Sequence, residues 1–72
     1  METDFFRDTD SIYSWQGDTG YFIRQDRIFG PEGWTGHFIF EGKITGGNGY
    51  TKFYFVENVV YGPENKLPWV EN

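Results

Sequence analysis

Residues 21–32 of the chain are YFIRQDRIFGPE, and residues 54–64 are YFVENVVYGPE. When one residue is omitted from the turn of the second copy, the apolar positions match and both copies end in Gly-Pro-Glu. Both stretches follow a Gly-rich segment, and both lead to a tryptophan, Trp34 directly and Trp69 after a short insertion. This pattern favours two pseudo-repeated units of three strands that bury their apolar faces against each other. A chance recurrence of turn residues is the alternative interpretation.

The segments between the glycines are typical of an all-β fold, because they are rich in β-branched and aromatic residues and show no helical periodicity. We expect a small antiparallel meander or partly closed barrel of about five to six strands. The predicted strands are 11–16, 21–25, 27–29, 34–45, 50–56 and 59–61, with turns at 17–20, 46–49 and 57–58. Residues 11–72 are expected to form a single β domain, and residues 1–10 an acidic segment that precedes it.

The predicted core depends on aromatic side chains. The chain has 72 residues, no cysteine and one histidine, so neither disulfides nor thiolate metal sites are available to stabilise it. Aromatic residues make up 22% of the chain and supply large apolar areas for burial. The alternation within residues 34–45 predicts that Trp34, Phe38 and Phe40 lie in the core and that His37 lies on the polar face.

The inventory of reactive side chains is poor for an enzyme. His37 is the only histidine, and neither Ser11 nor Ser14 lies in the glycine-flanked turn of a nucleophilic serine. The acidic residues Asp8 and Asp10 begin like a calcium loop, but Ile12 occupies the position of the third oxygen ligand. The sequence therefore predicts a protein without catalytic activity, metal or cofactor.

The net charge of −5 favours a basic partner. Residues 1–10 contain four acidic residues and one arginine, a local charge of −3, and direct binding to double-stranded nucleic acid is unfavourable for such a chain. No run approaches the roughly 20 apolar residues of a membrane span, and the acidic start is unlike a secretion signal. We therefore expect a cytoplasmic protein that does not contact a membrane.

The candidate binding residues come from strand alternation and from the acidic positions. If Phe53 points inward, Tyr50 and Tyr54 point outward, and the repeat places Tyr21 outward as well. Tyrosine is enriched at binding surfaces, although cross-strand packing is the alternative explanation for such a row. The predicted protein-binding residues are Tyr21, Tyr50, Tyr54, Glu32, Glu64, Asp4, Asp8 and Asp10.

Three hypotheses for function follow. The leading one is a non-enzymatic module that binds a basic protein, as a small inhibitor that masks a nucleic-acid-binding surface would. Small inhibitors of phages and mobile elements offer an analogy in size and charge. The second is an aromatic platform for carbohydrate or single-stranded nucleic acid. The third is a structural subunit that forms a homo-oligomer through an open sheet edge.

Overall fold

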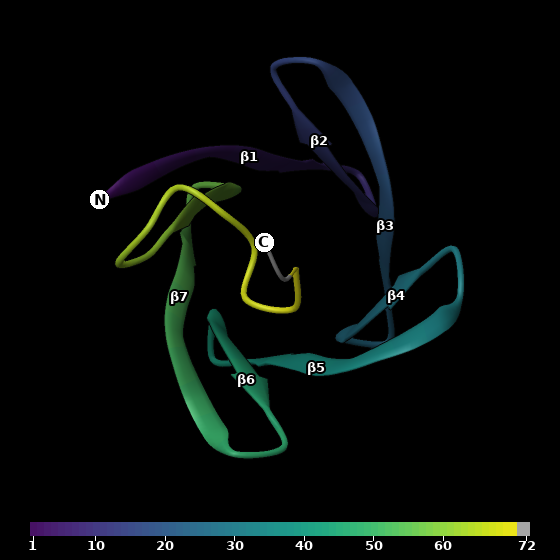
Figure 1. Cartoon of the computed structure of the whole chain (residues 1–72), viewed down its shortest axis with the longest axis vertical. Coiled ribbons are helices and arrows are strands. Elements are labelled where there is room, and N and C mark those ends of the chain that lie inside the picture. The colour runs from purple at the N-terminus through teal and green to yellow at the C-terminus, as the bar shows by residue number, and fades with distance from the viewer. Residues whose placement is uncertain (71–72) are drawn as a thin grey trace.

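The computed structural model describes residues 1–70, which form a closed antiparallel barrel (Figure 1). Each strand pairs with the next along the chain, and β1 pairs with β8 to close the barrel. The predicted all-β class and antiparallel meander are confirmed, with eight strands in place of five to six. The strands are β1 (Glu2–Asp8), β2 (Ser11–Ser14), β3 (Gly17–Arg24), β4 (Arg27–Gly30), β5 (Gly33–Phe40), β6 (Lys43–Gly46), β7 (Gly49–Val56) and β8 (Val59–Tyr61).

The barrel consists of four hairpins of one pattern that repeats every 16 residues, in units 1–16, 17–32, 33–48 and 49–64. The spacing is visible in four aliphatic residues that are fully buried: Ile12, Ile28, Ile44 and Val60. In Figure 1 the hairpins are arranged like the arms of a pinwheel around a common centre. A single hairpin cannot bury its apolar face, so the four units depend on one another for stability.

A threonine at the third position of each unit ties neighbouring units together. In the first unit, the Thr3 hydroxyl donates to the carbonyl oxygen of Val60 over 2.6 Å and accepts from the backbone N–H of Phe5 over 3.2 Å. The same two bonds recur at Thr19, Thr35 and Thr51. Because the partner carbonyl always belongs to the preceding unit, each threonine links two hairpins, and Thr3 links the first hairpin to the last.

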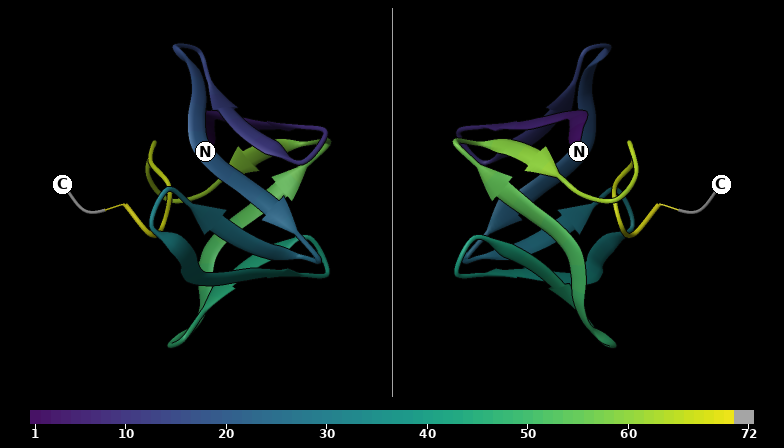
Figure 2. Two further views of the ribbon diagram at one scale, coloured as in Figure 1. Left: turned by 90° about the vertical axis from the view of Figure 1, so that its right-hand side faces the viewer. Right: turned by 90° about the vertical axis from the view of Figure 1, so that its left-hand side faces the viewer.

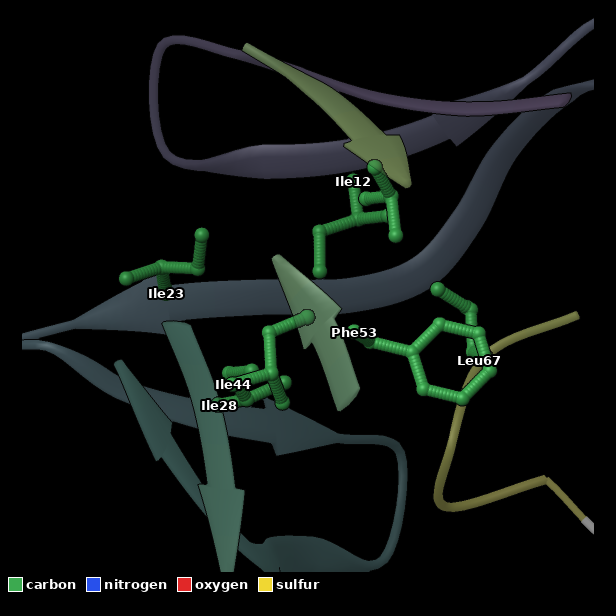
Figure 3. Close-up of a cluster of buried hydrophobic side chains, with 7 residues drawn as sticks. Ile12, Ile23, Ile28, Ile44, Phe53 and Leu67 are labelled. Carbon is green, nitrogen blue, oxygen red and sulfur yellow. The ribbon is translucent and has the colours of Figure 1, made fainter. Parts of the chain in front are cut away.

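The core is a stack of side chains inside the barrel (Figure 3). The four buried aliphatic residues are joined by Ile23 and Phe53, each 4% exposed, and by Leu67. At the seventh position of the units, Ile23, Ile39 and Phe55 pack with this cluster, whereas the first unit has Arg7 there. At the fifth position the four units have a ring: Phe5, Tyr21, His37 and Phe53.

The segment after β8 covers one end of the barrel. Figure 1 shows it passing over the centre of the pinwheel, and the side views of Figure 2 show it at one end of the strands. Leu67 inserts into the core with 2% of its surface exposed. Trp69 lies edge-on to the Tyr21 ring at 5.3 Å between centroids and beside the His37 ring at 5.6 Å. The apolar side chains of Leu67 and Trp69 thus close this end of the barrel interior.

The structure changes the expected strand boundaries and the repeat. Residues 1–10 do not precede the sheet, because Glu2–Asp8 form β1 and pair with both β2 and β8. The predicted turn at 17–20 lies within β3, where Gly20 has a φ of 86° at an irregularity in the pairing. The expected turns at 46–49 and 57–58 are confirmed. The repeat comprises four hairpins rather than two three-stranded units. These four units of 16 residues align without the one-residue gap that the two-unit alignment required.

The expected faces of the first half of the segment 34–45 were wrong, whereas Ile44, which the same alternation places on the core face, is fully buried. This segment is not one strand, because a turn at Glu41 and Gly42, both with positive φ, separates β5 from β6. Trp34 and Phe40 are 56% and 62% exposed, and Phe38 also lies outside, so these rings are not the core. The aliphatic residue Ile39 points inward in their place. His37, expected on the polar face, is half-buried against Trp69.

Candidate functional site

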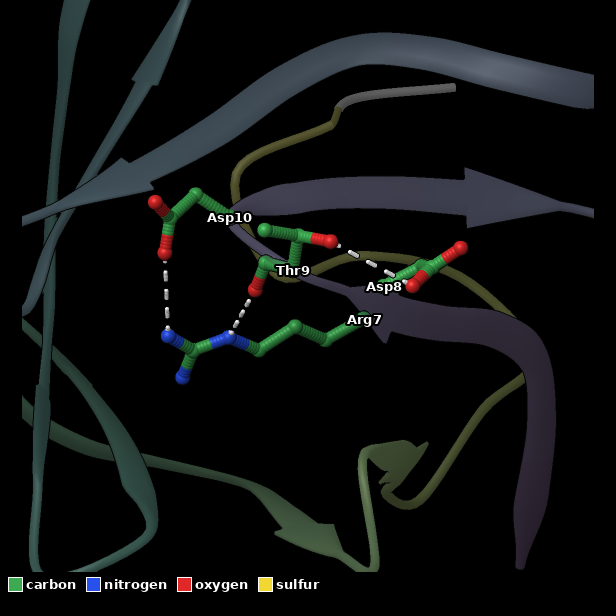
Figure 4. Close-up of polar contacts among 4 residues, drawn as sticks. All are labelled: Arg7, Asp8, Thr9 and Asp10. Carbon is green, nitrogen blue, oxygen red and sulfur yellow. Dashed lines mark hydrogen bonds and ion pairs between the residues drawn. The ribbon is translucent and has the colours of Figure 1, made fainter.

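The predicted acidic residues Asp8 and Asp10 lie at the turn between β1 and β2 (Figure 4). Arg7 donates from Nε to the carbonyl oxygen of Thr9 over 2.9 Å and lies 3.4 Å from a carboxylate oxygen of Asp10. Asp8 accepts a long bond from the Thr9 hydroxyl. Because Arg7 offsets the charge of Asp10, this turn is not a strongly negative surface.

Asp4 of β1 contacts the segment that covers the barrel end, and Glu64 belongs to that segment. The backbone N–H of Asp4 donates to Asn65, whose side-chain amide donates back to the Asp4 carboxylate, each over 2.8 Å. Glu64 forms an exposed ion pair with Lys66 at 3.1 Å. The first contact attaches the covering segment to β1, and the second is an ion pair within the segment itself.

Tyr50 and Tyr54 are exposed on the outside of β7, as predicted from alternation. Tyr54 stacks on Tyr61 of β8 at 5.7 Å, and the Lys43 ammonium lies 5.6 Å from the centre of the Tyr50 ring. Trp34, Phe38 and Phe40 are exposed on β5. We call these five exposed residues on β5 and β7 the outer aromatic face.

The outer aromatic face contains basic side chains between its rings. Lys43 of β6 pairs with Phe40 on one side and with Tyr54 on the other. Arg27 of β4 pairs with Phe38, and its guanidinium lies 5.9 Å from the centre of the Trp34 ring. The rings and cations therefore alternate across four neighbouring strands, an arrangement that the sequence analysis did not predict.

Tyr21 and Glu32 line one cavity, at the corner where the second unit meets the third. The cavity has a volume of about 420 Å³. Tyr21 does not point outward as predicted, because its neighbour Phe22 takes the outer position and stacks on Phe29 at 5.5 Å. We call this cavity the corner pocket; its lining side chains include Tyr21, Pro31, Glu32, Trp34 and Trp69.

Local sequence explains the shape of the corner pocket. The turn at Pro31 and Glu32 joins β4 to β5 and forms the rim. Gly30 leaves room for the Tyr21 ring beneath it, since a Cβ there would lie 2.7 Å from a ring carbon. Trp69 packs against the Tyr21 ring from the covering segment. Packing thus fixes the rings of Tyr21 and Trp69, and the more exposed Trp34 is held by a 3.1 Å hydrogen bond from its Nε1 to the carbonyl oxygen of His37.

The corner pocket has a negative lining. Among residues 1–70, Glu32 is the only charged residue that lines it, and no lysine or arginine does. Arg27 lies over Trp34 in a neighbouring hollow that also contains Asp26. Two further hollows contain Arg7 together with carboxylates. A cavity with three aromatic rings, one carboxylate and no basic side chain is suited to a cationic group.

Sequence reasoning found two of the four residues that give this pocket its chemistry. It selected Tyr21 for an outward position that the residue does not occupy, and Glu32 for the Gly-Pro-Glu corner where it lies. It placed Trp34 in the core and gave no role to Trp69. The available signal was that each Gly-Pro-Glu leads to a tryptophan, since these two tryptophans line one cavity.

Other site classes have less support in residues 1–70. Within this range, no group of three His, Asp or Glu side chains is arranged to hold a metal ion. The described residues include no helix long and apolar enough to cross a membrane. Comparison with models of known protein families, with curated proteins and with solved structures finds no match to this chain.

Proposed function

We propose that this protein is a non-enzymatic binding module that holds a cationic side chain of a basic protein partner in the corner pocket. The proposal depends on one observation: the rings of Tyr21, Trp34 and Trp69 line a cavity in which Glu32 is the only charged residue of the described part of the chain. In the proposed cytoplasmic role, the module covers a basic, nucleic-acid-binding surface of its partner and so acts as an inhibitor.

Electrostatic interactions favour a basic protein partner both during its approach and at contact. The net charge of −5 attracts a basic protein from afar and raises the rate of encounter. At contact, an ammonium or guanidinium group over an aromatic ring gains about 0.5–2 kcal/mol, and tryptophan is the most favourable ring. The carboxylate of Glu32 adds an opposite charge at the rim. Neutral and anionic side chains gain neither contribution.

The exposed residues beside the pocket would extend the contact. Trp34 belongs both to the corner pocket and to the outer aromatic face, so a partner seated in the pocket would also meet this face. Tyr50 and Tyr54 supply large contact areas at small cost in side-chain entropy.

The test is a titration of ¹⁵N-labelled protein followed through its three tryptophan indole N–H signals. The probe is Nα-acetyl-lysine methylamide, and the control compound is Nα-acetyl-norleucine methylamide, which has no charge. We expect the lysine probe to shift the signals of Trp34 and Trp69 and the norleucine compound to have little effect. Equal effects of both compounds would show that the pocket does not select a cation.

Substitutions distinguish binding in the corner pocket from long-range electrostatic attraction to the acidic chain. Trp34→Ala should weaken binding of the lysine probe about 2- to 30-fold, the range that corresponds to one cation–π contact. Glu32→Gln should cause a loss that disappears at high salt. Phe40→Ala is the matched control, because Phe40 is equally exposed but lies outside the pocket. Proteins captured from lysate by the parent but not by Trp34→Ala would then identify the partner.

A second candidate function is supported by the outer aromatic face. Arg27 and Lys43 alternate there with exposed rings, which is the arrangement used to bind single-stranded nucleic acid by stacking and phosphate contact. An oligothymidylate titration tests it. Shifts at Tyr50 and Tyr54, with an affinity that falls steeply as salt increases, would favour this function. The closed barrel leaves no strand among the described residues unpaired on either side, so it does not support edge-to-edge oligomers.

A further inference from the structure

The 16-residue repeat places a second cavity one unit before the corner pocket, where the first unit meets the second. Its volume is about 460 Å³. The turn at Trp15 and Gln16 corresponds to the turn at Pro31 and Glu32, and Phe5 corresponds to Tyr21. The two cavities therefore occupy equivalent positions in the fold. We call this cavity the second corner pocket; its chemistry comes from Asp4, Phe5, Trp15 and Asp18.

The second corner pocket also combines aromatic rings with carboxylates, but at different positions of the 16-residue repeat. Trp15 takes the position of Pro31, and Asp18 takes the position of Trp34. In the part of the chain that the structure describes, the lining contains the carboxylates of Asp4 and Asp18 and no basic side chain. Its charge is thus more negative than that of the corner pocket, and it has two aromatic rings rather than three.

The Asp18 carboxylate of the second corner pocket is held by a hydrogen bond, and the Trp15 ring is exposed to solvent. One oxygen of Asp18 accepts a 2.9 Å hydrogen bond from the backbone N–H of Gly20, which leaves its other oxygen outside this bond. Trp15 is 79% exposed, and its ring lies 6.2 Å from that of Phe6, which stacks on Tyr13. A fixed carboxylate beside an exposed indole gives a cation both an opposite charge and a ring face.

The other two corners differ. The third corner has Gly47, Asn48 and Tyr50 at the equivalent positions and no carboxylate. At the fourth corner the N-terminus meets the residue that follows β8, and Met1 and Gly62 exchange backbone hydrogen bonds of 2.8 and 2.9 Å. The combination of an acid, a tryptophan and no basic lining residue therefore occurs at two adjacent corners.

We infer that the second corner pocket binds a cationic side chain, so that the protein takes two such side chains of one basic partner at once. This inference rests on the proposed function of the corner pocket. It defines the partner more narrowly, as a surface or segment with two lysine or arginine side chains at the spacing of the corners. The molecule is 28 Å in its longest dimension, a distance that about eight extended residues span.

The test uses capped peptides with two lysines separated by two, four, six or eight Gly/Ser residues. Control peptides have one lysine at the same length, or two adjacent lysines at the same length and charge. At the matching spacing, we expect the Trp15 signal to shift together with those of Trp34 and Trp69. Linking the two contacts should strengthen binding about 10²- to 10⁴-fold over the single-lysine peptide.

Matched variants assign the gain to the second pocket. Asp18→Asn keeps the side-chain oxygen that accepts from the Gly20 N–H but removes the negative charge. It should abolish most of the affinity that the second lysine adds, without unfolding the protein. Asp8→Asn removes one charge outside both pockets and should leave the gain intact.

Two results would overturn the inference. If single-lysine peptides shift Trp34 and Trp69 but no spacing adds affinity or shifts Trp15, the second pocket is refuted and the proposed function stands. If no peptide shifts any indole signal, both are refuted.

Discussion

Replacing Thr3 with valine should lower the stability of the barrel markedly, although the two side chains have nearly the same shape. Thr3 is 3% exposed, and its hydroxyl bridges β8 and β1 through the bonds to Val60 and Phe5. Valine fills the same space without the hydroxyl, so the change removes two hydrogen bonds and creates no cavity. It therefore isolates the contribution of the threonine bridge to closure of the barrel.

The size of the effect follows from the two bonds. Each net hydrogen bond contributes about 0.5–1.5 kcal/mol, so Thr3→Val should reduce the free energy of unfolding by about 2 kcal/mol. A domain of 72 residues has a total of about 4–11 kcal/mol. For a domain of this size, a loss of about 2 kcal/mol lowers Tm by roughly 8–16 °C.

The assay is urea and thermal unfolding of the parent and three variants. Thr3→Ser keeps the hydroxyl and loses one methyl group, so it should cost only about 0.8 kcal/mol. Thr45→Val is the matched control, because Thr45 lies on the outer side of β6 opposite Phe38, and it should change stability by less than about 0.5 kcal/mol. If Thr3→Val and Thr45→Val unfold alike, the threonine bridge does not stabilise the barrel.

Two further predictions concern packing. Gly46→Ala should cost about 1–3 kcal/mol, because its Cβ would lie 2.8 Å from the His37 ring, whereas Gly47→Ala, with open space around the Cβ, should be neutral or stabilising. Equal stability of these two variants in urea would contradict the packing at the fifth position. Ile28→Ala should cost about 2–5 kcal/mol because Ile28 is fully buried, whereas Phe40→Ala should change Tm little. If Phe40→Ala lowered Tm more than Ile28→Ala does, the aromatic core predicted from the sequence would be correct instead.

The class of fold was predictable because glycines separate short β-rich segments throughout the chain. The number of strands was not, since the first strand is formed by an acidic segment and the matching Gly-Pro-Glu turns drew attention to a period of 32 rather than 16 residues. The threonines at 3, 19, 35 and 51 show the 16-residue period, and so does the aromatic residue at the sixth position of each unit. An alignment led by Gly-Pro-Glu and paired tyrosines was displaced by one residue, which reversed the direction of Tyr21.

The core and the candidate site were harder to predict for a physical reason. Both faces of β5 are apolar, with Phe38 and Phe40 outside and Ile39 inside, so alternation could not distinguish the buried face. The small interior accepts aliphatic side chains from all four units and leaves most large rings outside. The corner pocket depends on Trp69, which reaches Tyr21 only when the covering segment folds back over the barrel, and no local pattern indicates that contact.

Direct contact between a cation and the corner pocket can be measured by intermolecular nuclear Overhauser effects from a ¹³C-labelled Nα-acetyl-lysine methylamide. We expect cross-peaks from the ε-methylene protons of the probe to the rings of Tyr21, Trp34 and Trp69. We also expect Glu32→Gln to weaken these cross-peaks at low salt. Cross-peaks confined to Tyr50 and Tyr54, with none to the pocket rings, would contradict binding of a cation in the corner pocket.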